Sequence, residues 1–213
     1  MSVKKAYSIK NVINTRFKTI EVEGQWKAAI GTPELSGSWF IYGAPKNGKT
    51  SFAMKLAKYL TQYKRVAYNS VEEGLSLSIQ NAMKRENMLE VGGKMILLEK
   101  EDTEAMIKRL SHKKSPDIIF LDSVQFAELT FADYKKIKTI FKDKLFIYIS
   151  HVEGRVPEGR VARRIWRDAN IAIRVEGFCA FPVGRFGGGK PIIISKEKAE
   201  EYWGVKLENL MNK

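Results

Sequence analysis

The segment Gly43-Ala44-Pro45-Lys46-Asn47-Gly48-Lys49-Thr50 matches the phosphate-binding pattern GxxxxGK[ST] in full, and Ser51 follows it. It comes directly after the apolar run Trp39–Tyr42. A strand that ends in a glycine-bearing loop and continues as a helix directs several backbone N–H groups, and the positive end of the helix dipole, at one point. Residues 43–51 therefore predict a binding site for the phosphates of a nucleotide.

Three residues of this segment suit phosphate chemistry. Lys49 would reach the β- and γ-phosphates, and the Thr50 hydroxyl would ligate Mg²⁺. Gly48 lets the backbone approach the phosphates where a Cβ would obstruct it. A chance match in a chain of this length is expected on the order of one time in a hundred. The sequence therefore favours a working nucleotide site over a degenerate loop.

A second acidic element completes the predicted metal site. The buried-type apolar run Ile118–Leu121 ends in Asp122, and an aspartate at such a strand end holds Mg²⁺ or its bound water beside a phosphate loop. An apolar tetrapeptide before an aspartate is common, so this signal depends on its place after the loop. We predict Thr50 and Asp122 as the metal-binding residues.

The carboxylate that would activate water does not follow Asp122, because Ser123 stands there. The chain also has no Asn-Lys-x-Asp segment, which argues against a GTPase. The remaining carboxylates at a strand end are Glu72 and Glu73, and one of them could polarise a water in line with the γ-phosphate. The alternative is that both only stabilise the start of the following helix.

The net charge of +13 favours a polyanionic partner. Residues 152–167 concentrate this charge, with Trp166 among the arginines. Arginine neutralises phosphates while an aromatic ring stacks on an unpaired base, so this segment predicts binding of single-stranded nucleic acid. The alternative is a mobile loop that runs into a helix with a solvated basic face. The candidate contacts are Arg155, Arg160, Arg163, Arg164 and Arg167.

Strand and helix patterns alternate along the chain, which predicts an α/β fold with a parallel, doubly wound sheet. The ligand is then expected at the carboxyl ends of the strands. Strands are predicted at residues 65–70, 94–98, 117–122, 145–150, 171–175, 178–183 and 191–195. Helices are predicted at residues 51–63, 75–86, 103–110 and 197–203, and Thr103 is a candidate cap of the third.

The chain divides into an N-terminal arm, residues 1–37, and a core, residues 38–213. The arm has too many apolar residues for a disordered tail, so we expect it to pack on the core or on a neighbouring subunit. The single cysteine, Cys179, excludes an internal disulfide. With no apolar signal region and only strand-length apolar runs, the protein is expected to be soluble and cytoplasmic.

Four motifs in order resemble the ATPase motifs of the RecA-like family, with bacterial RadA and DnaB-type helicases as the nearest branches. They are Tyr-Asn-Ser-Val-Glu-Glu-Gly at 68–74, Ile-Ile-Phe-Leu-Asp-Ser-Val-Gln at 118–125, Ile-Ser-His-Val at 149–152 and Gly-Arg-Phe-Gly-Gly-Gly at 184–189. The resemblance covers residues 38–196. It implies a RecA-like P-loop fold with a mostly parallel sheet and C-terminal antiparallel strands, and it implies ATP and Mg²⁺ as ligands.

The resemblance also implies roles for single residues. Glu72 would be the general base, and His151 would sense the γ-phosphate. Arg185 would be a finger that reaches the nucleotide of a neighbouring subunit, which implies a ring or filament. The plainer alternatives are a satisfied polar histidine and an arginine in a surface turn. RadA has a lysine where Val183 stands, so a second cationic finger would have to come from Lys190.

These features lead to one hypothesis and two alternatives. The hypothesis is a Mg²⁺-dependent ATPase that assembles into a homo-oligomer and binds DNA, single-stranded by preference, in replication, recombination or repair. The first alternative is a KaiC-like nucleotide-dependent switch whose basic surface binds an acidic protein. The second is a helicase loader or packaging accessory that binds ATP but turns over little alone.

Overall fold

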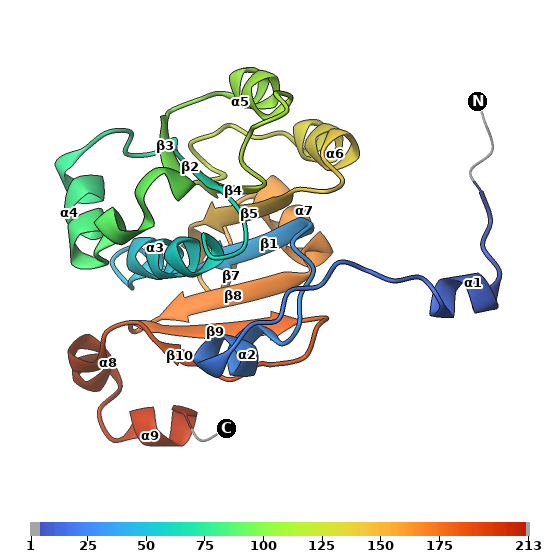
Figure 1. Cartoon of the computed structure of the whole chain (residues 1–213). Helices are drawn as coiled ribbons and strands as arrows, with labels where there is room; N and C mark the ends of the chain where they lie inside the picture. Colours follow the sequence, from blue (N-terminus) through green and yellow to red (C-terminus); the bar gives the residue numbers. More distant parts are fainter. Residues whose placement is uncertain (1–4, 212–213) are drawn as a thin grey trace.

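The strands form where apolar runs of five or six residues fill both faces of one sheet, and the helices form between them. The computed structural model describes residues 5–211 of the chain (Figure 1). The helical segments are α1 (Ile9–Ile13), α2 (Gly24–Ile30), α3 (Lys49–Leu60), α4 (Leu77–Arg85), the 3₁₀ segment η1 (Met88–Lys94), α5 (Thr103–Leu110), α6 (Phe131–Ile140), α7 (Arg160–Asp168), α8 (Lys196–Trp203) and α9 (Lys206–Met211). The strands are β1 (Gly37–Tyr42), β2 (Val66–Ser70), β3 (Met95–Glu99), β4 (Ile118–Asp122), β5 (Leu145–Ser150), β6 (Val152–Glu153), β7 (Val156–Pro157), β8 (Ile171–Glu176), β9 (Cys179–Gly184) and β10 (Ile192–Ile193).

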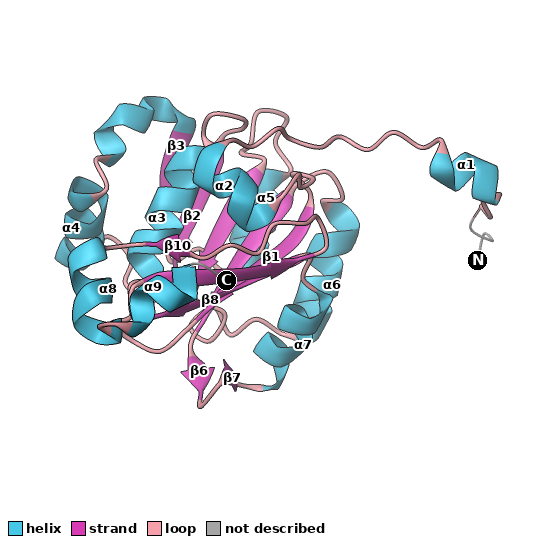
Figure 2. Ribbon diagram, turned by 90° about the horizontal axis from the view of Figure 1, so that it is seen from below, coloured by secondary structure: helices cyan, strands magenta, loops and turns pink. Residues whose placement is uncertain are grey.

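Eight strands form one sheet in the order β10-β9-β8-β1-β5-β4-β2-β3. The six strands from β8 to β3 are parallel to their neighbours, whereas β9 runs antiparallel to β8 and β10 antiparallel to β9. The predicted fold class, an α/β fold with a mostly parallel sheet and C-terminal antiparallel strands, is therefore confirmed. The separate two-stranded sheet β6–β7 projects beyond the carboxyl ends of the parallel strands (Figure 2).

The sheet is covered on both faces because side chains alternate along its strands. Trp39 and Ile41 point to the face covered by α3, where Leu56 is fully buried. Phe40 points to the opposite face, where it packs in one cluster with Tyr134 of α6 and residues of α5 and α7. Every residue of β5 is buried, as expected for a central strand of a doubly wound sheet.

Several predicted boundaries need correction. Residues 124–144 contain a helix that the sequence reading missed, α6, which begins with a capping box between Thr130 and Asp133. Asp102, and not Thr103, caps α5, because the Asp102 side chain accepts from the backbone N–H of Ala105. The predicted strand at 191–195 shortens to the two residues of β10. Residues 152–167 form the β6–β7 hairpin followed by α7 and not one long loop.

The N-terminal arm has two different halves. Val22 and Trp26 are buried against the core together with residues of α2, so the prediction that the arm packs holds for this half. Residues 5–19 lead away from the sheet, and α1 stands apart from the rest of the chain in both views (Figures 1 and 2). Residues 1–4 of the predicted arm lie outside the described residues. Within residues 5–211, no helix is both long enough and apolar enough to cross a membrane.

The close packing of α2 against the loop after β9 gives a test of the fold. Gly31 ends α2 at φ 70°, ψ −132°, and a Cβ there would lie 1.9 Å from the Phe186 carbonyl oxygen. Gly92 has similar angles, φ 52°, ψ −137°, but open space around it. We expect Gly31→Ala to lower the free energy of unfolding by about 3 kcal/mol or more and Gly92→Ala by about 1 kcal/mol. Urea denaturation measures both, and equal losses would show that the α2 contact contributes nothing.

Candidate nucleotide-binding site

The phosphate loop, residues 43–50, joins β1 to α3 as the sequence predicts, and it is held from outside by the turn between β8 and β9. The Asn47 side-chain oxygen accepts from Gly177 N–H at 2.7 Å, and its backbone carbonyl accepts from Phe178 N–H at 3.2 Å. A Cβ on Gly43 would lie 2.1 Å from the Val175 carbonyl oxygen. The loop is thus fixed before any ligand binds, with Gly48 in the left-handed conformation at φ 95° as N-cap of α3.

Lys49 lies in the first turn of α3 and points back along the loop. Its Nζ donates to the Ala44 carbonyl at 3.0 Å. Burial lowers the pKa of Lys49, and the negative charges of Asp122 and Glu72 oppose this shift. A phosphate oxygen is a stronger, charged acceptor for the Lys49 ammonium than the Ala44 carbonyl, so the site is suited to bind an anion at this position.

Asp122 ends β4 beside the loop, and the Tyr68 hydroxyl donates to it. Burial raises the pKa of Asp122 to about 6, against the Tyr68 hydrogen bond, and the charges of Glu72 and Glu73 raise it further. Three carboxylates thus face the single Lys49. This excess of negative charge and hard oxygen atoms fits a divalent cation such as Mg²⁺.

The described residues contain no group of three or more His, Cys, Asp and Glu side chains arranged to hold a metal ion. A magnesium site here would therefore be built from Asp122, the Thr50 hydroxyl, phosphate oxygens and water, in keeping with the preference of Mg²⁺ for few protein ligands.

Glu72 and His151 come from neighbouring parts of the same sheet edge and contact each other. His151 Nε2 lies 2.9 Å from Glu72 Oε2, so the structure brings these two predicted residues together beside Lys49 and Asp122. Glu73 points elsewhere, since its carboxylate accepts from Ser76 at 3.3 Å near the N-terminus of α4. The helix-start role that the sequence left open thus applies to Glu73, while Glu72 faces the phosphate loop.

Gln125 joins this site to the hairpin and was given no role by the sequence reading. Its Nε2 donates to Ser150 Oγ at 2.8 Å and to the Glu158 carbonyl at 2.9 Å, and its Oε1 accepts from His151 N–H at 3.3 Å. The residue lies in the 118–125 motif, three positions after Asp122, so its place after the metal strand was the available signal. It ties the ends of β4 and β5 to the segment that leads into α7.

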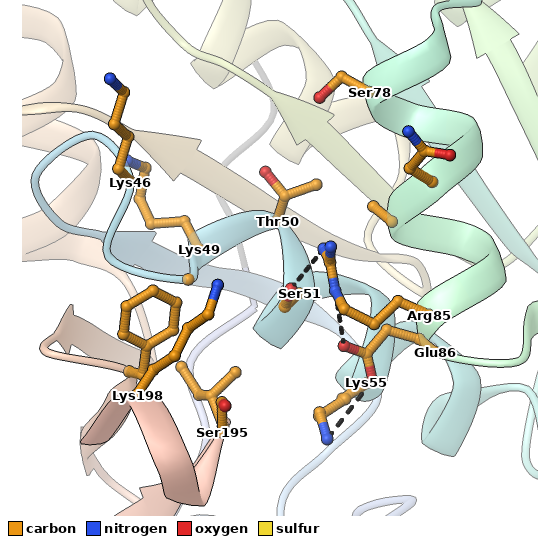
Figure 3. Close-up of a pocket in the computed structure, with 15 residues that line it drawn as sticks. Lys46, Lys49, Thr50, Ser51, Lys55, Ser78, Arg85, Glu86, Ser195 and Lys198 are labelled. Carbon is orange, nitrogen blue, oxygen red and sulfur yellow. Dashed lines mark hydrogen bonds and ion pairs between the residues drawn. The ribbon is translucent and has the colours of Figure 1, made fainter. Parts of the chain in front are cut away.

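A cleft of about 630 Å³ adjoins the phosphate loop, bounded by α3, α4 and the start of α8 (Figure 3). Arg85 crosses it to donate to Ser51 Oγ at 2.8 Å, and Lys55 pairs with Glu86 at 3.4 Å. Lys46, Lys49 and Lys198 line the same cleft. Its walls are therefore predominantly cationic and suit a phosphorylated ligand. The contributions of Arg85 and Lys198 were not predicted.

Arg185 lies at the opposite edge of the sheet from the phosphate loop. Gly184 pairs with Ile171, the first residue of β8, and Arg185 N–H donates to the Asn170 carbonyl at 3.0 Å. The loop instead follows Tyr42, which pairs with Arg174 near the far end of β8. Arg185 is exposed and cannot complete the site of its own chain. Lys190, on the same loop, is also at that edge, where its N–H donates to the Ala28 carbonyl.

The five arginines predicted to bind nucleic acid divide into two groups. Arg163 is bonded within the chain, to Glu153 at 2.8 Å and to the Pro157 carbonyl at 3.1 Å, and the Arg164 guanidinium lies 3.5 Å from the centre of the Phe131 ring. Arg155, Arg160 and Arg167 are exposed and make no hydrogen bond or ion pair with other described residues. The latter three are the ones free to contact a ligand.

Comparison with known proteins was made by family models, by sequence and by structure. No protein-family model matches the chain, and no curated protein matches it. Among solved structures it is similar to the flagellar accessory protein FlaH from Methanocaldococcus jannaschii, with a TM-score of 0.59 and 18% identity over 84% of this chain and 96% of that one.

Two further solved structures are similar. A helicase ATPase domain has a TM-score of 0.55 and 15% identity over 78% of this chain and 84% of that domain. A KaiC-like protein from Pyrococcus horikoshii has a TM-score of 0.52 and 14% identity over 72% of this chain and 79% of that one. At these identities the likeness concerns the fold, and the fold is that of RecA-like P-loop ATPases.

The raised pKa of Asp122 predicts how metal-free protein responds to pH. The ionised carboxyl is disfavoured in the folded state, so its contribution is most favourable below the unfolded value of 3.8 and is lost as the pH rises through about 6. Asp122→Asn, which keeps an acceptor for Tyr68, should raise the free energy of unfolding at pH 8 by up to about 3 kcal/mol and change it little at pH 4.

Urea denaturation in EDTA at both pH values measures this difference. Asp143→Asn removes an exposed carboxyl and serves as the matched control, with little effect expected at either pH. A loss of stability in Asp122→Asn at pH 8 would show that the Asp122 charge is well compensated without metal, contrary to this account.

Proposed function

We propose that the chain is a Mg²⁺-dependent ATPase that works as a homo-oligomer and binds single-stranded DNA. The observation that carries the proposal is the meeting of the phosphate loop, Asp122 and the Glu72–His151 pair at one edge of the sheet. These groups can bind a triphosphate, hold its metal and activate a water molecule, which are the three requirements of phosphoryl transfer to water.

In the proposed reaction the backbone N–H groups of residues 43–50 bind the β- and γ-phosphates, and Lys49 contributes its positive charge to the same oxygens. Thr50 and Asp122 would hold Mg²⁺, which supplies neutralisation of charge on the transferring phosphoryl group. Glu72 accepts the proton of the attacking water. His151 orients the Glu72 carboxylate through their hydrogen bond.

Arg185 enters the proposal as a residue acting in a neighbouring chain. Its exposed place at the far sheet edge supports this role, because only a head-to-tail arrangement could bring it to a phosphate loop. A guanidinium added from outside would stabilise the negative charge that develops on the γ-phosphate.

The DNA surface is proposed to be the hairpin β6–β7 and the exposed side of α7. Support comes from the exposed Arg155, Arg160 and Arg167, from the net charge of +13 and from the Gln125 hydrogen bonds that connect this segment to the nucleotide site. Binding of phosphates by these arginines would be strongly dependent on salt.

Replacement of the proposed base separates hydrolysis from binding. Glu72→Gln should lower kcat for ATP about 100-fold or more, because the water loses its proton acceptor, while nucleotide affinity changes little. The adjacent Glu73→Gln is the matched control and should retain most of the activity. Steady-state phosphate release, with Lys49→Ala as the blank, measures all three variants. Equal effects of the two glutamine substitutions would remove Glu72 from its proposed role.

The DNA surface is tested by ATP turnover with and without single-stranded DNA at low salt. Arg155→Ala/Arg160→Ala/Arg167→Ala should abolish stimulation by DNA and lower the slope of affinity against salt by about three contacts. Lys136→Ala/Lys142→Ala/Lys206→Ala removes the same charge from other exposed positions and should leave stimulation intact. Turnover of the unaltered protein that is indifferent to DNA would favour the nucleotide-dependent switch with a protein partner.

A further inference from the structure

The first half of the arm carries an apolar surface that covers nothing in its own chain. Ile9, Val12 and Ile13 lie on one side of α1 at spacings of three and four residues, with Tyr7 and Phe17 flanking them. Ile9 and Ile13 are each 76% exposed. In the described chain, residues 5–211, no residue of α1 is buried. A short helix with such a surface is stable only when that surface packs against something.

A matching apolar groove lies at the opposite end of the molecule. It has a volume of about 750 Å³ and is formed by α4, its preceding turn, η1 and the edge strand β3. Leu77 and Leu89 on its rim are 70% and 93% exposed, and Leu75 is exposed beside them. The arm and this groove together hold eight of the fourteen large apolar side chains that are exposed in the described part of the chain.

Charge also matches between the two surfaces. Residues 5–18 of the arm contain four basic side chains and no acidic one. Residues 71–102, which build the groove and its surroundings, contain seven acidic and four basic side chains, a net charge of −3 within a chain of +13. A basic amphipathic segment and a more acidic apolar groove attract each other and fit in the manner of a helix bound in a groove.

The geometry excludes the arm of the same chain as the occupant. Figures 1 and 2 both place α1 on one side of the sheet and α4 on the other, with the whole sheet between them. A second copy of the chain can supply the arm without strain. Such a contact joins unlike surfaces, so it repeats head to tail and generates a ring or filament.

The same contact would carry the finger loop toward the neighbour's nucleotide site. On the donating chain, the loop that bears Arg185 is bonded to α2, since Gly189 N–H donates to the Ala29 carbonyl at 2.8 Å and Thr32 N–H to the Phe186 carbonyl at 3.2 Å. On the accepting chain, α4 serves both surfaces. Its Arg85 lines the nucleotide cleft, while its Met83 lines the groove.

We propose that residues 7–17 of one copy dock in the groove between α4, η1 and β3 of the next copy, and that this contact holds the subunits together. The inference rests on the oligomer of the proposed function and names its contact. It requires neither bound nucleotide nor DNA, so association can be measured separately from hydrolysis.

Sedimentation velocity of nucleotide-free protein over a range of concentrations tests the contact. The unaltered chain should self-associate beyond the dimer. An arm variant, Ile9→Asp/Ile13→Asp, and a groove variant, Leu77→Asp/Leu89→Asp, should each associate at least about tenfold more weakly, since a carboxylate would be buried in an apolar contact. Asn11→Asp adds charge on the other side of α1 and should associate normally. All four positions are exposed, and circular dichroism checks that each variant is folded.

Mixing the two variants gives the decisive result. The arm variant keeps an intact groove and the groove variant keeps an intact arm, so an equimolar mixture should form dimers and nothing larger. The proposal is overturned if the mixture stays monomeric, if either variant associates as well as the unaltered chain, or if the unaltered chain is a monomer throughout. The last result would assign the groove to a different protein or the arm to a contact in cis.

Discussion

The parallel pairing of β1 with β4's neighbour β5 is the constraint on which the candidate site depends. Because β1, β5, β4 and β2 run in the same direction and in register, their carboxyl ends meet at one edge. The phosphate loop, His151, Asp122 and Glu72 each follow one of these ends. Residues separated by up to about a hundred positions thereby face one ligand without any long-range bond made for that purpose. The apolar side chains that fill both faces of the strands keep this register fixed.

The interior of the site is electrostatically incomplete in the protein alone. Asp122, Glu72 and Glu73 raise one another's cost of ionisation around the single Lys49, and the loop N–H groups add positive potential that meets no anion of the chain. A metal–polyphosphate complex supplies both missing charges at once. The observed hydrogen bonds of Lys49 to Ala44 and of Tyr68 to Asp122 satisfy these groups within the fold in the meantime.

Much of this arrangement could be predicted from the sequence, because the phosphate pattern and the apolar strands are local signals. The contact between Glu72 and His151 was implied only through the resemblance to a family, since no local rule relates residues 79 positions apart. Helix α6 was missed because its apolar side chains are few and its start depends on the Thr130–Asp133 capping box. Gln125 and the free surface of α1 could not be predicted, because hydrogen-bond partners and exposure arise only from tertiary packing. The roles of Arg185 and of the arginines at 155–167 are still predictions.

The separation of Arg185 from its own phosphate loop has a consequence for the stoichiometry of any assembly. Each chain offers a half-site at either end, so an open row of n subunits completes n − 1 sites and leaves one unused half at each terminus. Only closure into a ring completes all n. A dilute, unassembled chain would then hold nucleotide without consuming it, and specific activity would increase with protein concentration. Loss of one subunit from a ring would silence one site and free two chain ends for a new partner.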